Sequence, residues 1–272
     1  MLPLNNIAFV INRSKPSAQA VAETLVNLTE KQGAKAVVIE DYPLKEGFLE
    51  GFDACCAIGG DGTLLGAVSE SVQRQVPIFG VNQGKLGFLA TFSPEEAQEQ
   101  WADFLEGHYM IDHRVLLNCK TATGVEKQVL NDVVIKNSVI TRLIDLTVSS
   151  ENDLITECSC DGLIFSTPTG STAYNLSAGG PIIHPSARVF TLTPICPHTL
   201  THRSVILSDD MPIAVNTLDA EVVPAVKLDG RYHFEDKNEF PLTITISEKT
   251  LPLLQSQSYS HFRILRNKLG WG

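Results

Sequence analysis

The chain has 272 residues, of which 43% are hydrophobic and 19% charged, so it can bury a sizeable core and is not a disordered chain. Its net charge of −10 argues against broad nucleic-acid binding, which needs a basic face, but leaves room for a local basic pocket around a phosphorylated small molecule. No apolar run is long enough to span a bilayer and no basic leader is visible, so we expect a cytoplasmic protein that binds neither membrane nor nucleic acid.

The first hundred residues alternate strand-like and helix-like patterns. Residues 7–11 form a short apolar run, residues 17–32 carry apolar side chains at helical spacing, and residues 36–39 form the next apolar run. A strand, a helix and a strand in this order predict a parallel βαβ unit. Further strands are expected at 53–58 and 76–81, and helices at 64–74 and 94–106, the last opened by Ser93 as N-cap.

A glycine-rich turn, Gly-Gly-Asp-Gly-Thr at residues 59–63, follows the third strand. Such a turn aims backbone N–H groups at an anion and lets a ligand approach closely. Asp61 is unusual there, because a phosphate cradle has no use for a negative charge, and a carboxylate among such amides suggests a general base for a hydroxyl group. The alternative is that Asp61 only caps a helix, and this stretch alone favours neither.

A second glycine-bearing loop, residues 82–89, follows the next strand. Ligands in open parallel sheets bind at the carboxyl ends of the strands, so we expect both loops in one site.

After His108 the helical patterns nearly disappear, and short alternating segments separated by turns predict an antiparallel β domain. We therefore predict an α/β plus β fold. A Rossmann-like parallel α/β domain (1–108) is followed by a mostly antiparallel β domain (109–250), with the ligand site in the cleft between them and a tail (251–272) that packs back on the first domain. The expected strands of the second domain are 115–120, 129–136, 143–149, 154–158, 163–166, 205–207, 213–215, 225–228 and 242–246.

Residues 161–181 form a second constellation that is too dense in small polar groups for an ordinary strand pair. Tyr174 can stack on a base, and Asp161 can accept hydrogen bonds from a ribose diol or an amide. Upstream, Asn131 and Asp132 interrupt an apolar strand, which is costly unless they meet a ligand or partner. Singly each residue is better explained as a satisfied turn, but together they indicate a nucleotide site. Five hydroxyls belong to this segment: Ser166, Thr167, Thr169, Ser171 and Thr172.

Together these motifs resemble the ATP-dependent NAD kinases over nearly the whole chain, to about residue 246. The carriers are residues 59–63, 82–88, 131–132 and 161–181, with 193–198 and 228–230 in support. The first motif is shared with phosphofructokinases and with diacylglycerol and sphingosine kinases, so the specificity lies in its combination with the 161–181 segment.

The resemblance implies that the γ-phosphoryl group of ATP is transferred to the 2′-hydroxyl of the adenosine ribose of NAD, giving NADP and ADP, with Asp61 as general base. It implies Mg²⁺ or another divalent cation carried by ATP, no metal held by the protein alone, and a homodimer or homotetramer. The NAD-binding residues that it implies are Asp61, Gly62, Phe88, Asn131, Asp132, Arg142, Asp161, Thr172, Ala173, Tyr174, Ser177 and Arg231.

Ser159 departs from the family pattern, since many members have Arg two residues before the acid at Asp161, and this puts a phosphate or subunit contact in doubt. Two other readings remain open at this point. A lipid kinase would share the glycine–aspartate turn, but the 161–181 segment and the lack of an amphipathic membrane element argue against it. A non-catalytic NAD(P)-sensing protein would be favoured by loss of the acid, yet Asp61 is present.

Overall fold

The computed structural model describes residues 1–12, 16–39, 42–84, 87–137, 142–218 and 224–271. Contacts within the chain define two compact units, residues 1–113 with 251–272 and residues 114–250. The chain passes from one unit to the other inside strand β5 (Tyr109–Lys120) and again inside strand β16 (Leu242–Ser256). From the sequence we expected domain boundaries near residues 108 and 250. These domain boundaries remain a prediction, because compact units defined by contacts are not the same as domains.

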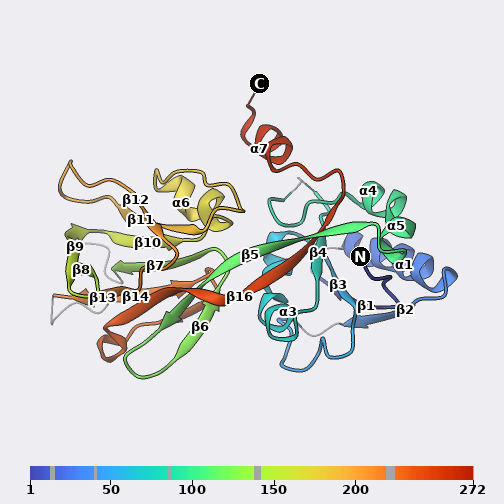
Figure 1. The fold of residues 1–272 in the computed structure, drawn as a ribbon, viewed down its shortest axis with the longest axis horizontal. Coiled ribbons are helices and arrows are strands. Elements are labelled where there is room, and N and C mark those ends of the chain that lie inside the picture. The colour runs from blue at the N-terminus through green and yellow to red at the C-terminus, as the bar shows by residue number, and fades with distance from the viewer. Residues whose placement is uncertain (13–15, 40–41, 85–86, 138–141, 219–223, 272) are drawn as a thin grey trace. The chain divides into compact units, whose positions relative to one another are not determined.

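The first unit is built on a parallel sheet with the strand order β2-β1-β3-β4-β16 (Figure 1). Every residue of β3 and β4 is buried, as expected for central strands of a parallel sheet that is covered on both faces. The parallel α/β architecture predicted from the sequence is thereby confirmed. The other strands of this sheet are β1 (Asn6–Ile11), β2 (Lys35–Ile39), β3 (Ala54–Ile58) and β4 (Ile78–Val81).

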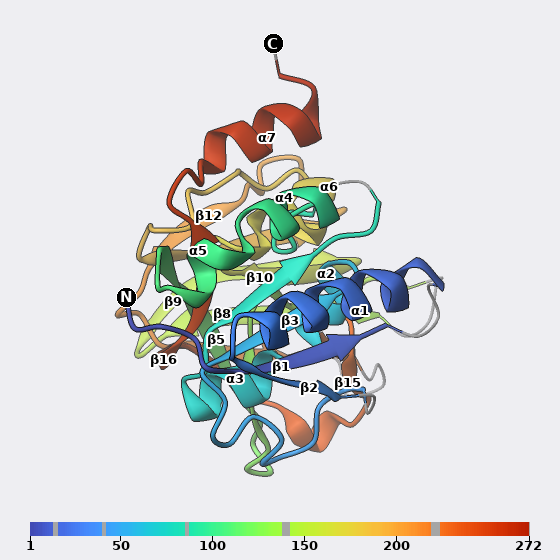
Figure 2. The same ribbon diagram turned by 90° about the vertical axis from the view of Figure 1, so that its right-hand side faces the viewer.

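Helices α1 (Pro16–Lys31), α4 (Pro94–Glu99) and α5 (Trp101–Leu105) lie on one side of strands β1, β3 and β4 (Figure 2). They enclose a core rich in aromatic rings, in which the Trp101 ring lies 5.8 Å from the rings of both Phe9 and Phe79. The start of α4 is as predicted: Ser93 caps the helix and forms a reciprocal capping box with Glu96.

Two predicted helices are each divided into two. The expected helix 64–74 consists of α2 (Asp61–Leu65) and α3 (Val68–Arg74). The break falls at Gly66, where a Cβ atom would lie 2.1 Å from the Tyr42 ring, so the chain uses glycine to let that ring approach. The expected helix 94–106 is interrupted at Gln100, between α4 and α5.

The second unit contains a six-stranded antiparallel sheet with the order β12-β11-β10-β7-β14-β15. A second antiparallel group joins the first half of β16 to β13, β8 and β9. One hydrophobic core holds both, because side chains such as Phe165 and Val148 belong to the same buried cluster. The bounds are β6 (Glu126–Val129), β7 (Asp132–Asn137), β8 (Ile144–Ser150), β9 (Asp153–Cys160), β10 (Gly162–Ser166), β11 (Val189–Ile195), β12 (Val205–Ser208), β13 (Ile213–Thr217), β14 (Pro224–Leu228) and β15 (Tyr232–Phe234).

The antiparallel β domain is thus confirmed, but several strands differ from the sequence prediction. Strand β5 begins at Tyr109 instead of residue 115, and β15 was not predicted. The strand expected at 129–136 is two strands, β6 and β7, separated by a turn at residues 130–131. Strand β11 was not predicted, although four of its residues are buried. Strand β16 extends beyond the expected 242–246 to Ser256. Short helices complete the chain: η1 (Gly170–Thr172), α6 (Tyr174–Ser177), η2 (Lys237–Glu239) and α7 (His261–Leu269). In the described parts of the chain, each helix is too short or too polar to cross a bilayer.

Candidate active site

The Asp61 side chain joins the two glycine-bearing loops of the first unit. Its Oδ2 accepts the backbone N–H of Phe88 at 3.0 Å, and its Oδ1 accepts those of Leu89 at 3.2 Å and Ala90 at 2.8 Å. Helix α2 is capped at Gly60 with no side-chain hydrogen bond, so the helix-capping role considered for Asp61 is wrong. The carboxylate instead ties the turn after β3 to the loop after β4.

This arrangement leaves the Asp61 carboxylate with one unused acceptor position. Two carboxylate oxygens offer about four lone pairs. Oδ1 accepts two backbone N–H groups, whereas Oδ2 accepts one. Asp61 is half-buried, so this lone pair of Oδ2 is available to a further donor. The close approach depends on Gly87, where a Cβ atom would lie 2.1 Å from Asp61 Oδ1.

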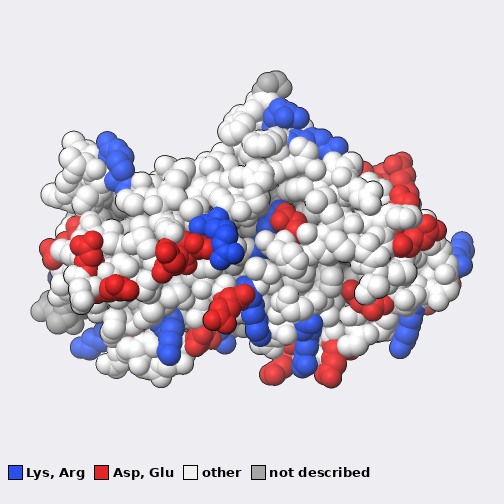
Figure 3. Space-filling view, viewed as in Figure 1, with Lys and Arg blue, Asp and Glu red and all other residues white. Residues whose placement is uncertain are grey.

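Two further predicted residues flank Asp61. Gly62 is exposed, and its carbonyl accepts a hydrogen bond from the Tyr42 hydroxyl. Phe88 is half-buried, and the Lys268 ammonium lies 5.5 Å from the centre of its ring. Lys268 belongs to helix α7, over which basic side chains gather on the face seen in Figure 3. A local positive charge near Phe88 suits an anionic ligand despite the negative charge of the whole chain.

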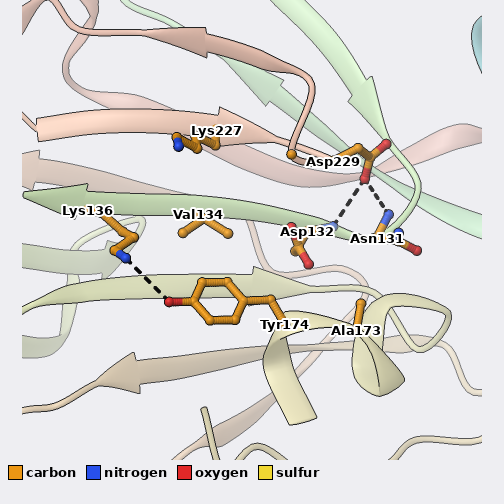
Figure 4. Close-up of a pocket in the computed structure, with 9 residues that line it drawn as sticks. Asn131, Asp132, Val134, Lys136, Ala173, Tyr174, Lys227 and Asp229 are labelled. Atoms are coloured by element: carbon orange, nitrogen blue, oxygen red, sulfur yellow. Dashed lines mark hydrogen bonds between the residues drawn. The ribbon is translucent and has the colours of Figure 1, made fainter. Parts of the chain in front are cut away.

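The second unit holds a pocket of about 340 Å³ beside the turn at residues 130–132. Figure 4 shows Asp132, Val134 and Lys136 of β7 on one side and Tyr174 of α6 on the other. The Tyr174 hydroxyl accepts a hydrogen bond from Lys136 Nζ at 3.5 Å, and the ring is partly exposed toward the pocket. The complete lining is Asn131, Asp132, Val134, Lys136, Ala173, Tyr174, Lys227, Asp229 and Gly230.

The backbone at residues 130–132 is held from two sides. The Asp229 carboxylate accepts the N–H groups of Leu130 at 2.9 Å, Asn131 at 2.6 Å and Asp132 at 3.3 Å. From the other side, Thr167 donates its hydroxyl to the Leu130 carbonyl and its backbone N–H to the Asn131 carbonyl. The turn that presents Asn131 and Asp132 to the pocket is therefore fixed by hydrogen bonds in both directions.

Asp132 and Asp229 form a buried pair of carboxyl groups. Burial and the nearby Asp229 charge raise the pKa of Asp132 to about 7. Burial also raises the pKa of Asp229, although its three backbone donors act in the opposite direction. Because Asp229 has these donors, we assign it the negative charge and place the proton on Asp132. Below neutral pH, Asp132 is then a hydrogen-bond donor in the pocket wall.

Most hydroxyls of the 161–181 segment form hydrogen bonds within the protein. Ser166, Thr167 and Ser171 are fully buried and bond to backbone carbonyls of their own unit. Asn175 is equally buried and bonds to the backbone at Ser171 and Pro181 and to two threonine hydroxyls. These small polar residues, which indicated a nucleotide site in the sequence, thus fix the conformation of the loop that carries Ala173 and Tyr174.

The pocket includes four of the predicted residues, Asn131, Asp132, Ala173 and Tyr174. The others do not line it. Thr172 is half-buried beside it, Ser177 is exposed at the end of α6, and Arg142 and Asp161 are exposed near the ends of β8 and β9. Arg231 is exposed in the turn after Asp229 and acts on the pocket through its charge, which lowers the pKa of Asp229. Ser159, where many family members have Arg, donates its hydroxyl to the Asp145 carboxylate.

Five lining residues were not among the predicted site residues, although the last two belong to the 228–230 stretch that supports the family resemblance: Val134, Lys136, Lys227, Asp229 and Gly230. A signal for the first two was present, because Val134 and Lys136 alternate with Asp132 along β7 and so share its face. Asp229 precedes Gly230 between two strands, which is a strong hairpin signal, but its role depends on contacts with residues about a hundred positions away.

Known proteins resemble this chain along its whole length. A model of the ATP-NAD kinase N-terminal domain matches residues 22–109, and a model of the C-terminal domain matches residues 130–256. The NAD kinase of Geotalea daltonii is 38% identical, over 99% of each chain. The crystal structure of an NAD kinase from Archaeoglobus fulgidus in complex with ATP has a TM-score of 0.79 at 25% identity, covering 97% of this chain and 98% of that one. Yeast NADH kinase complexed with NADH shares the fold, with a TM-score of 0.84 at 23% identity over 99% of this chain and 88% of that one.

Proposed function

This chain belongs to the ATP-NAD kinase family, and on that premise we propose that it transfers the γ-phosphoryl group of ATP to the 2′-hydroxyl of the adenosine ribose of NAD, giving NADP and ADP. The enzyme is a phosphotransferase with an alcohol group as acceptor. The observation that carries the proposal is the Asp61 carboxylate, which three backbone N–H groups hold in place with one lone pair of Oδ2 to spare.

We assign the general base to Asp61 Oδ2. The acceptor hydroxyl must lose its proton as it attacks the phosphorus atom, and a positioned carboxylate takes such a proton efficiently. The donors at Phe88, Leu89 and Ala90 orient the group without using the lone pair that would receive the proton. Phosphoryl transfer asks the protein mainly to position the two substrates and to balance charge.

We assign the pocket of the second unit to NAD. Tyr174 offers an aromatic face for stacking, and Asp132 and Asn131 offer hydrogen-bond partners for the adenine and a ribose. Lys136 and Lys227 supply positive charge for the pyrophosphate group. The reaction requires the ribose hydroxyl of this NAD at Asp61. ATP brings Mg²⁺ or another divalent cation, which offsets the charge on the phosphate oxygens.

We also propose that the chain self-associates through its β-rich unit. Strand β12 is an edge strand of the six-stranded sheet and exposes the apolar side chains of Val205 and Ile206. Exposed apolar edge strands are ready to pair with another chain. Light scattering during gel filtration should give a dimer or tetramer mass, and a monomer at every concentration tested would contradict this.

The decisive experiment for the activity compares three acceptors. Purified protein is incubated with ATP, Mg²⁺ and either NAD, an NAD lacking the adenosine 2′-hydroxyl, or an NAD lacking the adenosine 3′-hydroxyl. Phosphorylation is followed with ATP labelled on its γ-phosphate, and NADP is detected with glucose-6-phosphate dehydrogenase. We expect labelled product from NAD and from the 3′-deoxy compound only. No NADP above a heat-killed control, or label on the 2′-deoxy compound, would contradict the proposal.

A further inference from the structure

A second cavity, of about 270 Å³, lies in the β-rich unit away from the pocket assigned to NAD. Strands β9, β10 and β11 and the segment that leads into β12 form its walls. Half of the lining residues are apolar, and the others include a cysteine, a histidine and an arginine. The lining residues are Ile155, Thr156, Cys158, Leu163, Leu192, Pro194, Thr201, His202, Arg203 and Val205.

The cysteine and the histidine form a pair in this cavity. Cys158 Sγ lies 3.1 Å from Nδ1 of His202, within hydrogen-bonding distance for sulfur. The pair joins two segments that are far apart in sequence, since Cys158 belongs to β9 and His202 to the segment before β12. Arg203 is held beside it by hydrogen bonds from its guanidinium group to the carbonyls of Leu200 at 2.6 Å and His202 at 2.7 Å. A thiol next to such groups has the environment of a reactive cysteine.

The groups that face Cys158 have opposite effects on the ionisation of its thiol. Cys160 of β9 and His202 favour the thiolate of Cys158, whereas Asp145 of β8 opposes it. Arg203 also lines the cavity, and the facing residues of β10 and β11 are the apolar Leu163, Leu192 and Pro194. The Cys160 thiol and the His202 imidazole, against the opposing effect of burial, lower the pKa of Cys158 to about 6. Elsewhere burial acts alone and raises the pKa of both Cys55 and Cys119 to about 12. Cys158 therefore differs from the inert buried thiols of this chain.

We propose that Cys158 is an oxidation-sensitive nucleophile, held as a thiolate by His202, which reacts with hydrogen peroxide. Only 3% of Cys158 is exposed to solvent, so the cavity admits small oxidants rather than bulky ones. This cavity shares no lining residue with the pocket assigned to NAD, and the proposal does not depend on the kinase reaction.

The proposed oxidation needs only hydrogen peroxide, the Cys158 thiolate and a proton from His202. The Cys158 thiolate attacks one oxygen of hydrogen peroxide, an S–O bond forms, and the O–O bond breaks. The sulfur is oxidised to sulfenic acid and the peroxide is reduced. The departing hydroxide takes the proton of the His202 imidazolium and leaves as water, which makes His202 the acid of the step.

The proposal is tested by treating the folded full-length protein with peroxide, removing the peroxide with catalase, and then unfolding the protein in denaturant that contains dimedone, which tags sulfenic acids wherever they formed. Digestion and mass spectrometry then give the tagged fraction at each cysteine, with fragment spectra that distinguish Cys158 from Cys160. The internal reference is Cys196, the exposed cysteine. We expect Cys158 to be tagged faster than Cys196 at pH 6.5, and its rate to fall only near pH 6.

Two variants in the segment before β12 show whether Cys158 reacts because His202 stabilises its thiolate or only because oxidants can reach it. His202→Gln should slow tagging of Cys158 at pH 6.5 at least about threefold, because loss of the imidazole partner raises the thiol pKa, and a rise of one pKa unit from about 6 lowers the thiolate fraction at this pH about threefold. His198→Gln is the matched control, because His198 joins β9 only through its backbone N–H to the Ser159 carbonyl, and the rate should not change. Faster tagging of Cys196 than of Cys158 in the unaltered protein, or equal rates in both variants, would overturn the proposal.

Discussion

Asp229 Oδ1 accepts the backbone N–H of Asn131 at 2.6 Å, across 98 positions of sequence. The same carboxylate accepts the N–H groups of the residues on either side of Asn131. A carboxylate placed this way fixes the conformation of a turn. It has little capacity left to bind a ligand, because backbone N–H groups use most of its acceptor positions. We infer that Asp229 positions Asn131 and Asp132 for NAD and is not itself a contact with it.

Replacing Asp229 by Ala should weaken NAD binding and destabilise the protein. Three partly buried N–H groups would lose their acceptor, which should lower the free energy of unfolding by roughly 3 kcal/mol and raise KM for NAD about tenfold, with a smaller effect on kcat. Denaturant unfolding and steady-state kinetics measure both effects. Asp236→Ala is the control, because Asp236 is exposed and accepts a single N–H from Asn238. Equal behaviour of the two variants would contradict the positioning role.

The Asp132 carboxyl should leave a signature in the pH dependence of stability. Its pKa in the folded protein is raised from 3.8 to about 7, so between these values the folded state binds more protons than the unfolded state. Its contribution to stability is therefore complete below about pH 4 and is lost as the pH rises through 7. Relative to the unaltered protein, Asp132→Asn should gain ~4 kcal/mol in free energy of unfolding between pH 4 and pH 8, because each of about three pKa units corresponds to ~1.4 kcal/mol. A difference between the two proteins that is constant with pH would contradict the shift.

The close approach of Asp61 to the loop after β4 should make Gly87 sensitive to a single methyl group. A Cβ atom at Gly87 would lie 2.1 Å from Asp61 Oδ1, whereas one at Gly84, in the same loop, would meet nothing within 4 Å. Gly87→Ala should lower kcat at least tenfold, because the carboxylate or the loop must move. Gly84→Ala should keep kcat within about twofold if this geometry controls the reaction. Matched kinetics of the two variants, with thermal unfolding as a check on folding, decide between these outcomes.

Stacking on Tyr174 should depend on its ring and little on its hydroxyl. Tyr174→Leu removes the aromatic face and should raise the Kd for NAD about tenfold, since stacking on a base contributes ~1–3 kcal/mol. Tyr174→Phe loses only the 3.5 Å contact with Lys136 and should bind NAD almost as the unaltered protein does. Isothermal titration calorimetry gives both constants, and a larger loss for Phe than for Leu would refute stacking.

The fold class was predicted well from the sequence, because the fold class follows from local patterns of apolar and polar residues. Continuous apolar runs and helical spacing located the parallel strands and α1, and alternation located most of the antiparallel strands. The breaks in the helices were not predictable, since Gly66 reflects the position of the Tyr42 ring, which belongs to a distant part of the chain. Strand β11 was missed because residues 189–195 contain two threonines and a proline, which obscure the apolar pattern.

The site was predicted less completely than the fold. Motif resemblance located Asp61, Asn131, Asp132, Ala173 and Tyr174, and the family it indicated is confirmed. It included Asp229 in the 228–230 stretch but gave it no role, because its contacts span about a hundred residues, and it could not show that most hydroxyls of the 161–181 segment form internal hydrogen bonds. The roles of all the predicted site residues stay predictions: Asp61, Gly62, Phe88, Asn131, Asp132, Arg142, Asp161, Thr172, Ala173, Tyr174, Ser177 and Arg231.

Kinetics of Asp61→Asn test the central claim most directly. Asparagine keeps the shape of the side chain and one oxygen that accepts from Leu89 and Ala90, but its amide nitrogen accepts neither the Phe88 N–H nor a proton. We predict that kcat falls about 10²–10⁴-fold, the usual contribution of a general base, while the Kd for NAD stays within about threefold, because in the proposed mechanism Asp61 contacts only the reacting hydroxyl. A variant that keeps the kcat of the unaltered enzyme would show that Asp61 is not the base.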